Sequence, residues 1–196
     1  MNSSLPTWLT YRNGLAARTA RDNFLVVKRN LCLIGLLLVL LGGVTLRAAP
    51  VNAQVFSVSG TVEFAAPDSS SYAPLQKGQS LAVGSTVRTG DDGVAVLVTT
   101  VGSAIQVGNS SIVKLNKLAF AKSGSDVTQR TAVVQLTSGV ISALIDPSTP
   151  KITDFQVQTP EGAAAARGTF YAVLVYHGKT YIGVKEGKVA VKAAGQ

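Results

Sequence analysis

Few side chains in this sequence have the types and spacing that catalysis requires. The chain holds one histidine, His177, and one cysteine, Cys32, and its carboxylates are scattered with no spacing that selects a pair. Metal sites and catalytic triads need several converging groups, and glycoside hydrolysis needs a carboxylate pair. The sequence therefore predicts that the protein is not an enzyme, binds no metal and uses no cofactor.

The residues that most resemble isolated ligands have simpler interpretations. His177 precedes Gly178 between two strand-like runs, so we interpret it as a hairpin-tip residue rather than a lone ligand. Asp91 and Asp92 form an acidic turn, which by itself is a weak basis for a calcium site. Cys32 begins an apolar run, whereas a lipidated cysteine ends one, so we interpret it as a small apolar residue.

Three residues remain as candidates for binding a partner: Arg167, Tyr176 and Tyr181. Arg167 follows four alanines, which allow close backbone approach, so we expect its guanidinium to be partly buried. It either makes a structural hydrogen bond or contacts an anionic ligand or partner. Tyr176 and Tyr181, with Tyr72 and Tyr171, either form a sugar-stacking face or serve in packing, as aromatic residues of strands commonly do.

The chain that must position these residues has the periodicity of β-strands. Residues 154–159 alternate between polar and apolar side chains, and turn signals recur about every ten residues. Residues 94–98, 140–145 and 171–176 are apolar on both faces, so we expect them to be central and covered on both sides. The sequence predicts an all-β fold, a compact twisted stack of short strands that is solenoid-like or sandwich-like.

An uncharged apolar run at residues 31–46 follows two basic residues and divides the chain. As a helix it would span about 24 Å, short of the ~30 Å hydrocarbon core. It is either a signal peptide cleaved after Ala53, which leaves the protein periplasmic or secreted, or an uncleaved anchor that holds it at the inner membrane facing the periplasm. The predicted parts are a basic n-region or cytoplasmic tail, the apolar helix with its cleavage region, and a β domain: residues 1–30, 31–53 and 55–193.

The positive charge of the chain lies mostly in that leading part. Six Lys or Arg and one acidic residue precede Gln54, and the rest of the chain carries 12 basic and 9 acidic residues, a net of +3 out of the total of +8. The basic residues of the β domain are scattered, without a dense patch. Nucleic-acid binding needs a clustered electrostatic footprint, so we predict no nucleic-acid partner.

Two segments near the C-terminal end carry the most informative pattern. Residues 168–173 read Gly-Thr-Phe-Tyr-Ala-Val, and residues 184–191 read Val-Lys-Glu-Gly-Lys-Val-Ala-Val, with a turn at Glu186 and Gly187. Both resemble the closing motifs of the bacterial FecR domain. We expect Gly168 to take a conformation open only to glycine, so its role is structural. Shorter motifs follow the family's order over about 135 residues, at residues 58–62, 75–78, 81–84, 84–89, 93–97, 102–107, 135–140 and 155–160.

This resemblance implies a periplasmic, non-enzymatic module that recognises an envelope protein. In the best-understood architecture of the family, the module is the outer part of a single-pass regulator that senses an outer-membrane transducer of iron–siderophore uptake and controls a sigma factor. Residues 1–30 are fewer than a sigma-regulating domain needs, and we expect no transducer-docking subdomain after Val191. We therefore expect a protein-recognition or sensory module; the alternatives are a carbohydrate- or peptidoglycan-binding module and a sigma-factor regulator without the usual terminal domains.

Overall fold

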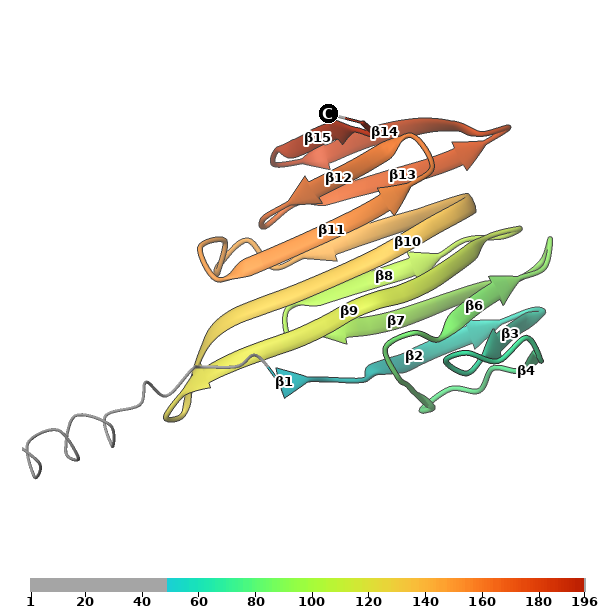
Figure 1. Ribbon diagram of the computed structural model, residues 1–196, viewed down its shortest axis with the longest axis horizontal. Helices are drawn as coiled ribbons and strands as arrows, with labels where there is room; N and C mark the ends of the chain where they lie inside the picture. The colour runs from blue at the N-terminus through green and yellow to red at the C-terminus, as the bar shows by residue number, and fades with distance from the viewer. Residues whose placement is uncertain (1–48, 196) are drawn as a thin grey trace, which may run out of the picture. The chain divides into compact units, whose positions relative to one another are not determined.

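The computed structural model describes residues 49–195, and within that range the chain forms strands and turns with no helix (Figure 1). The prediction of an all-β fold is confirmed. The expected apolar helix, Cys32 and the basic residues 1–30 lie outside the described residues. Among residues 49–195, no helix is long and apolar enough to cross a membrane.

The strands form one continuous ladder that folds into two layers around a common core. The strands of layer A, in order of pairing, are β4 (Ala73–Pro74), β3 (Val62–Ala65), β6 (Thr86–Thr89), β9 (Ile112–Ser123), the first part of β10 (Asp126–Ile145), β11 (Thr153–Thr159), β12 (Gly162–Ala166) and β15 (Val189–Ala193), with β1 (Ala49–Pro50) also beside β9. The strands of layer B are β5 (Ser80–Leu81), β2 (Ala53–Ser59), β7 (Val94–Thr100), β8 (Ser103–Val107), the last part of β10, β13 (Phe170–Tyr176) and β14 (Lys179–Glu186). The pair β10–β11 is parallel, and the other pairs are antiparallel.

Strand β10 joins the two layers. It pairs with β9 and β11 in layer A, and from Gly139 onward with β8 and β13 in layer B. Gly139 has a φ of +84°, and a Cβ atom there would overlap the side chain of Ser111. The Oγ of Ser111 accepts a hydrogen bond from the amide of Val140 at 2.8 Å. The crossing therefore requires glycine and is held by a side-chain hydrogen bond.

Alternate residues of each strand point into the core, as the pattern predicts for half-buried strands. In β11, Phe155 and Val157 are fully buried, whereas Asp154, the residue before Phe155, is exposed. Tyr171 is the largest of the fully buried side chains. The predicted alternation of residues 154–158 is confirmed, and it assigns these residues to the inner and outer faces of layer A.

The prediction that three apolar runs are covered on both sides is wrong. Residues 94–98, 140–145 and 171–176 lie in the middle of layer B, and their outward side chains include Leu144, 59% exposed, and Leu174, 38% exposed. The reason is that residues 49–195 form two layers, so each strand has only one covered face. The strands are also not uniformly short, because β9 has 12 residues and β10 has 20.

Strand pairing begins before residue 55, where we predicted the start of the β domain. Ala49 pairs with Phe120 of β9, and the amide of Val51 donates to the carbonyl of Leu118 at 3.1 Å. Ala53 begins β2 and is fully buried opposite Leu81. The predicted cleavage position after Ala53 therefore falls inside a paired strand.

The two ends of this sandwich differ. At one end, which we call the closed end, the edge strands β4 and β5 have two residues each, and the segment that contains them buries Leu75 and Leu81 to 5% and 1% exposure. At the other end the edges are β14 and β15, with eight and five residues, and each pairs along one side only among residues 49–195 (Figure 1). This second end, which we call the open end, contains the candidate site.

Candidate functional site

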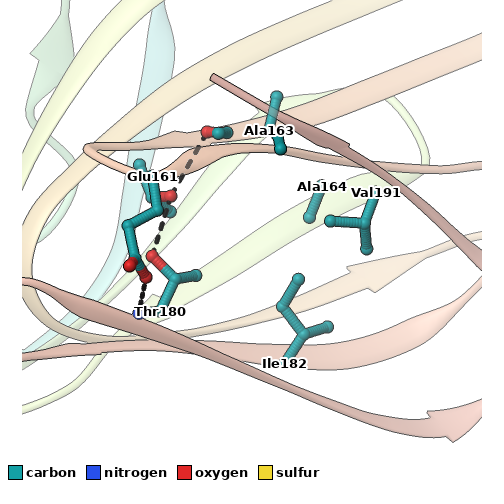
Figure 2. A pocket seen from close by; sticks show the side chains of 9 residues that line it. Glu161, Ala163, Ala164, Thr180, Ile182 and Val191 are labelled. Carbon is teal, nitrogen blue, oxygen red and sulfur yellow. Dashed lines mark hydrogen bonds between the residues drawn. The ribbon is translucent and has the colours of Figure 1, made fainter. Parts of the chain in front are cut away.

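An apolar groove lies at the open end between β12 and β15 of layer A and β14 of layer B. Its walls include Ala163, Ala164, Ile182 and Val191, and Figure 2 shows the last three converging. The cavity has a volume of about 180 Å³. A cavity of roughly 150 Å³ lined by apolar side chains holds a benzene molecule, so this groove has room for one large apolar side chain or two small ones.

These residues meet because the chain passes from layer B to layer A in the turn between β14 and β15. Strands β14 and β15 follow each other in sequence, but they do not pair; β14 pairs with β13 and β15 with β12. The turn between them contains Gly187 at a φ of +88°, where a Cβ would lie 2.9 Å from Oγ1 of Thr169. The turn predicted at Glu186 and Gly187 is confirmed, but it joins two layers instead of two paired strands.

Core-facing side chains at this end remain exposed. Val191 faces the groove from β15 and is 63% exposed, and Val184 of β14 is 46% exposed. Ile182, two residues before Val184, and Val189, two residues before Val191, are partly buried and pack against the core. The hydrophobic interior is therefore exposed to solvent at the open end. Burying these side chains would be favourable by roughly 25 cal/mol per Å² of apolar surface.

A carboxylate closes one end of the groove. Oε2 of Glu161 accepts a hydrogen bond from the backbone amide of Thr180 at 2.6 Å (Figure 2). Oε1 accepts one from Nζ of Lys179 at 3.4 Å. The hydrogen bond from the Thr180 amide, and then the one from Lys179, lower the pKa of Glu161. Glu161 is thus held ionised, and it occupies an edge amide of β14 that a further strand would otherwise use.

Arg167 does not have the environment that we expected. Its side chain is exposed, because Ala166 before it points into the core and Arg167 points outward. Together with Asp154 and Lys188 it lines a shallow depression on the outer face of layer A, beside the start of β15. The expectation of a partly buried guanidinium is therefore wrong, and its role in partner binding stays a prediction.

Tyr176 and Tyr181 lie on the opposite side of the open end. They belong to β13 and β14, point out from layer B and are 61% and 55% exposed. Tyr181 pairs with the exposed Leu174, and the ring of Tyr176 lies against that of His177 with centroids 4.1 Å apart. The structure therefore brings the two tyrosines to one face and separates them from Arg167.

The other two tyrosines do not join them. Tyr171 is 1% exposed, its hydroxyl has no hydrogen-bond partner among the described residues, and burial raises its pKa. The ring of Tyr72 lies 4.2 Å from the guanidinium carbon of Arg88. A face of four tyrosines is thus not formed.

The remaining chemical candidates have structural roles in the part of the chain that the structure describes. His177 lies at the β13–β14 hairpin tip, as predicted, with a φ of 47°. Oδ1 of Asp92 accepts a hydrogen bond from the amide of Thr61 at 3.1 Å, and this hydrogen bond lowers the pKa of Asp92. Residues 49–195 contain no group of three or more metal-ligating side chains.

The sequence did not reveal the groove. In the sequence, Ile182, Val184, Val189 and Val191 alternate with other residues as strand residues do, but alternation does not say whether the face they share is covered. Glu161 was one of several scattered acids, and its link to Thr180 connects positions 19 residues apart. The alanine-rich strand β12 was the available signal, because small side chains leave space beside them.

Comparison with known proteins supports the resemblance seen in the motifs. A family model described as "FecR protein" matches residues 85–190. The matched range begins in layer A and includes all of the open end except the last residues of β15. No curated protein and no solved structure matches the chain.

Proposed function

Since this chain belongs to the FecR family, we propose that it is a non-catalytic recognition module of the bacterial cell envelope, and that a protein partner binds at its open end. FecR-type modules are associated with envelope signalling, so a partner rather than a substrate is the expected ligand. Sensory transmission to a sigma factor is one use of such binding. The proposal concerns the recognition step.

The exposure of core-facing side chains at the open end carries this proposal. Val191 and Val184 point toward the interior and yet are 63% and 46% exposed. Contiguous exposed apolar surface with a polar rim is typical of sites where another protein docks. Here Glu161, which lines the groove, and Lys179, which forms an ion pair with it, supply polar groups at its rim.

Site-specific photocrosslinking in native cells tests the proposal. A photoreactive residue at position 191 should crosslink to an envelope protein, whereas the same residue at position 80, on an edge strand of the closed end, should not. Position 80 is a suitable control because Ser80, like Val191, is exposed on an edge strand. Equal products from both positions, or none from position 191, would contradict binding at the open end.

The start of the fold favours an attached N-terminal segment. Cleavage after Ala53 would remove β1 and the fully buried Ala53 that pairs with Leu81. We therefore propose the anchored alternative, in which residues 31–46 hold the β domain at the inner membrane facing the periplasm. The intact mass of the protein from fractionated cells decides this, because a mature chain that begins at Gln54 would overturn it.

Carbohydrate or peptidoglycan binding is a second candidate, favoured by the shared exposure of Tyr176 and Tyr181 on one face. Aromatic rings with one apolar face and a polar edge suit ligands that are partly apolar and partly wet. The double variant Tyr176→Ala and Tyr181→Ala should lose binding to purified peptidoglycan and keep its fold. If the unaltered protein does not bind peptidoglycan, this candidate is removed.

A further inference from the structure

Among the strands of residues 49–195, none pairs with the outward edge of β15. The amide of Ala194 donates to the carbonyl of Glu161 at 2.9 Å, so residue 194 directs its hydrogen-bonding groups toward β12. Such residues alternate along an antiparallel ladder, and the β12–β15 register has no bulge. The amides and carbonyls of Val189, Val191 and Ala193 therefore point away from β12, toward the open edge.

The edge of β14 is less available. The amide of Thr180 points away from β13, and Glu161 already accepts its hydrogen bond at 2.6 Å. A bulge at the Phe170–Tyr171 step also shifts the register at the other end of β14. Of the two long edges at the open end, β15 is therefore the one that can take a complete additional strand.

A strand added beside β15 would complete the core. Side chains at every second position would point inward, about 7 Å apart, into the cavity of about 180 Å³ beside Ile182 and Val191. The small side chains of Ala164 and Ala193 leave this volume for side chains from the partner. The inward positions of the incoming strand should therefore carry bulky apolar residues.

The remaining side chains of the added strand would lie on the outer face of layer A, beside charged side chains of this protein. Arg167 and Lys188 line the outer depression next to β15 with one acid, Asp154, and Lys192 projects from β15 itself. Three basic side chains against one acidic side chain favour acidic residues on the incoming strand. The same lysines oppose pairing with a second copy of β15, because they would meet like charges.

We infer that β15 takes up an extended segment of a protein partner in which bulky apolar side chains alternate with acidic ones, so that the partner adds one strand to layer A. This inference rests on the proposed function, since it names the chemistry of the partner at the open end. Main-chain hydrogen bonds hold the segment, and the groove and the basic rim select its sequence.

Synthetic peptides test the inference on the full chain in detergent micelles. The probe is a fluorescent peptide of about eight residues in which Leu and Glu alternate. One control replaces Glu by Lys, and the other keeps the composition but groups the leucines together. We expect the first peptide to bind about tenfold more tightly than either control at low salt, with the advantage over the Lys peptide shrinking as salt rises.

A proline substitution separates edge pairing from simple apolar contact. Val191→Pro removes an amide that points to the open edge, so the β12–β15 ladder keeps its hydrogen bonds while the docking edge loses one. This variant should lose binding of the Leu–Glu peptide, and Tyr181→Ser on the other face should keep it. Upon binding, amide hydrogen exchange should slow at residues 189, 191 and 193, and remain unchanged at 190 and 192.

The outcomes distinguish the inference from the proposed function. Equal binding of the three peptides, or unchanged binding by a folded Val191→Pro variant, overturns strand addition. If position 191 still crosslinks to an envelope protein in that case, the open end binds its partner in another way and the proposed function stands. If the peptide result and the crosslink both fail, the proposed function fails as well.

Discussion

The two ends of the sandwich solve the same physical problem differently. A sheet ends in a strand whose backbone groups have no neighbour, and proteins protect such edges with short strands, charge or covering segments. The closed end uses two of these devices: β4 and β5 have two residues each, and the segment around them buries Leu75 and Leu81. Its interior is sealed by the chain itself.

Among residues 49–195, the open end is protected by charged side chains alone. Its edge strands are long, the groove beside them is apolar, and Lys188 and Lys192 accompany β15 while Glu161 occupies one amide of β14. Lysines discourage pairing between identical copies without sealing the core. The difference indicates that stability depends on the closed end and the middle of the sandwich, whereas the open end is free to bind.

The largest expected effect tests that division by deleting a side chain of the closed end. Leu81 is 1% exposed and part of the core, so Leu81→Ala should lower the free energy of unfolding by about 2–5 kcal/mol. Urea denaturation followed by far-UV circular dichroism measures the change. A cost below about 1 kcal/mol would show that the closed end is not part of the cooperative core.

A matched pair of valines provides the control for this comparison. Val62 of β3 and Val191 of β15 both point inward from layer A, but they are 4% and 63% exposed. Val62→Ala should cost about 2 kcal/mol, and Val191→Ala no more than about 0.5 kcal/mol. Equal costs would mean that the open end is sealed in solution, by a second copy or by another part of the chain.

Two glycines with similar backbone angles extend the comparison to the turns. Gly78 near the closed end has a φ of +81° with open space around it, whereas Gly168 has a φ of +68° and its added Cβ would lie 2.7 Å from Cα of Pro147. Gly78→Ala should cost about 1–2 kcal/mol for the left-handed conformation alone. Gly168→Ala should cost a further 1–3 kcal/mol, roughly, for overpacking.

Thermal unfolding of both variants measures the difference. A smaller loss for Gly168→Ala than for Gly78→Ala would show that the turn before β13 yields easily. In that case close packing against Pro147 would not be the reason that the FecR-like Gly-Thr motif has glycine at position 168.

The sequence predicted much of this fold because the signals involved are local. Alternation placed Phe155 and Val157 inside and Asp154 outside, the His177–Gly178 pair marked a hairpin, and Gly168 marked a backbone conformation with positive φ. Each of these follows from the residues themselves and their immediate neighbours. The family motifs likewise read short segments in a fixed order.

What the sequence could not predict depends on how strands are assigned to layers. Nothing local shows that β10 leaves layer A at Gly139, or that β14 and β15 belong to different layers despite the short turn between them. Those two facts separate Arg167 from Tyr176 and Tyr181, and they create the groove between Ile182 and Val191. They also leave layer B with one uncovered apolar face, where we expected two covered ones.

The smallest expected effect concerns Glu161, the one side chain that partly closes the open end. Its pKa is lowered in the folded protein by the Thr180 amide, so ionised Glu161 stabilises the fold at pH values above the unfolded pKa of about 4.3. That contribution is lost as the pH falls through the lower, folded value. Glu161→Gln keeps an oxygen acceptor and removes the charge, so its denaturation midpoint should lie slightly below that of the unaltered protein near neutral pH, and the two midpoints should converge as the pH falls through the folded pKa of Glu161.

Asp92→Asn is the matched control, because Asp92 also accepts a backbone amide, from Thr61, and also has a lowered pKa, but lies away from the groove. The two variants should show the same pH dependence of stability. Only Glu161→Gln should speed exchange of the Thr180 amide, since it weakens the acceptor at the edge of β14. If the Thr180 amide exchanges equally slowly in both variants, something other than the carboxylate protects that edge. The open end would then be less open than the distribution of exposed valines indicates.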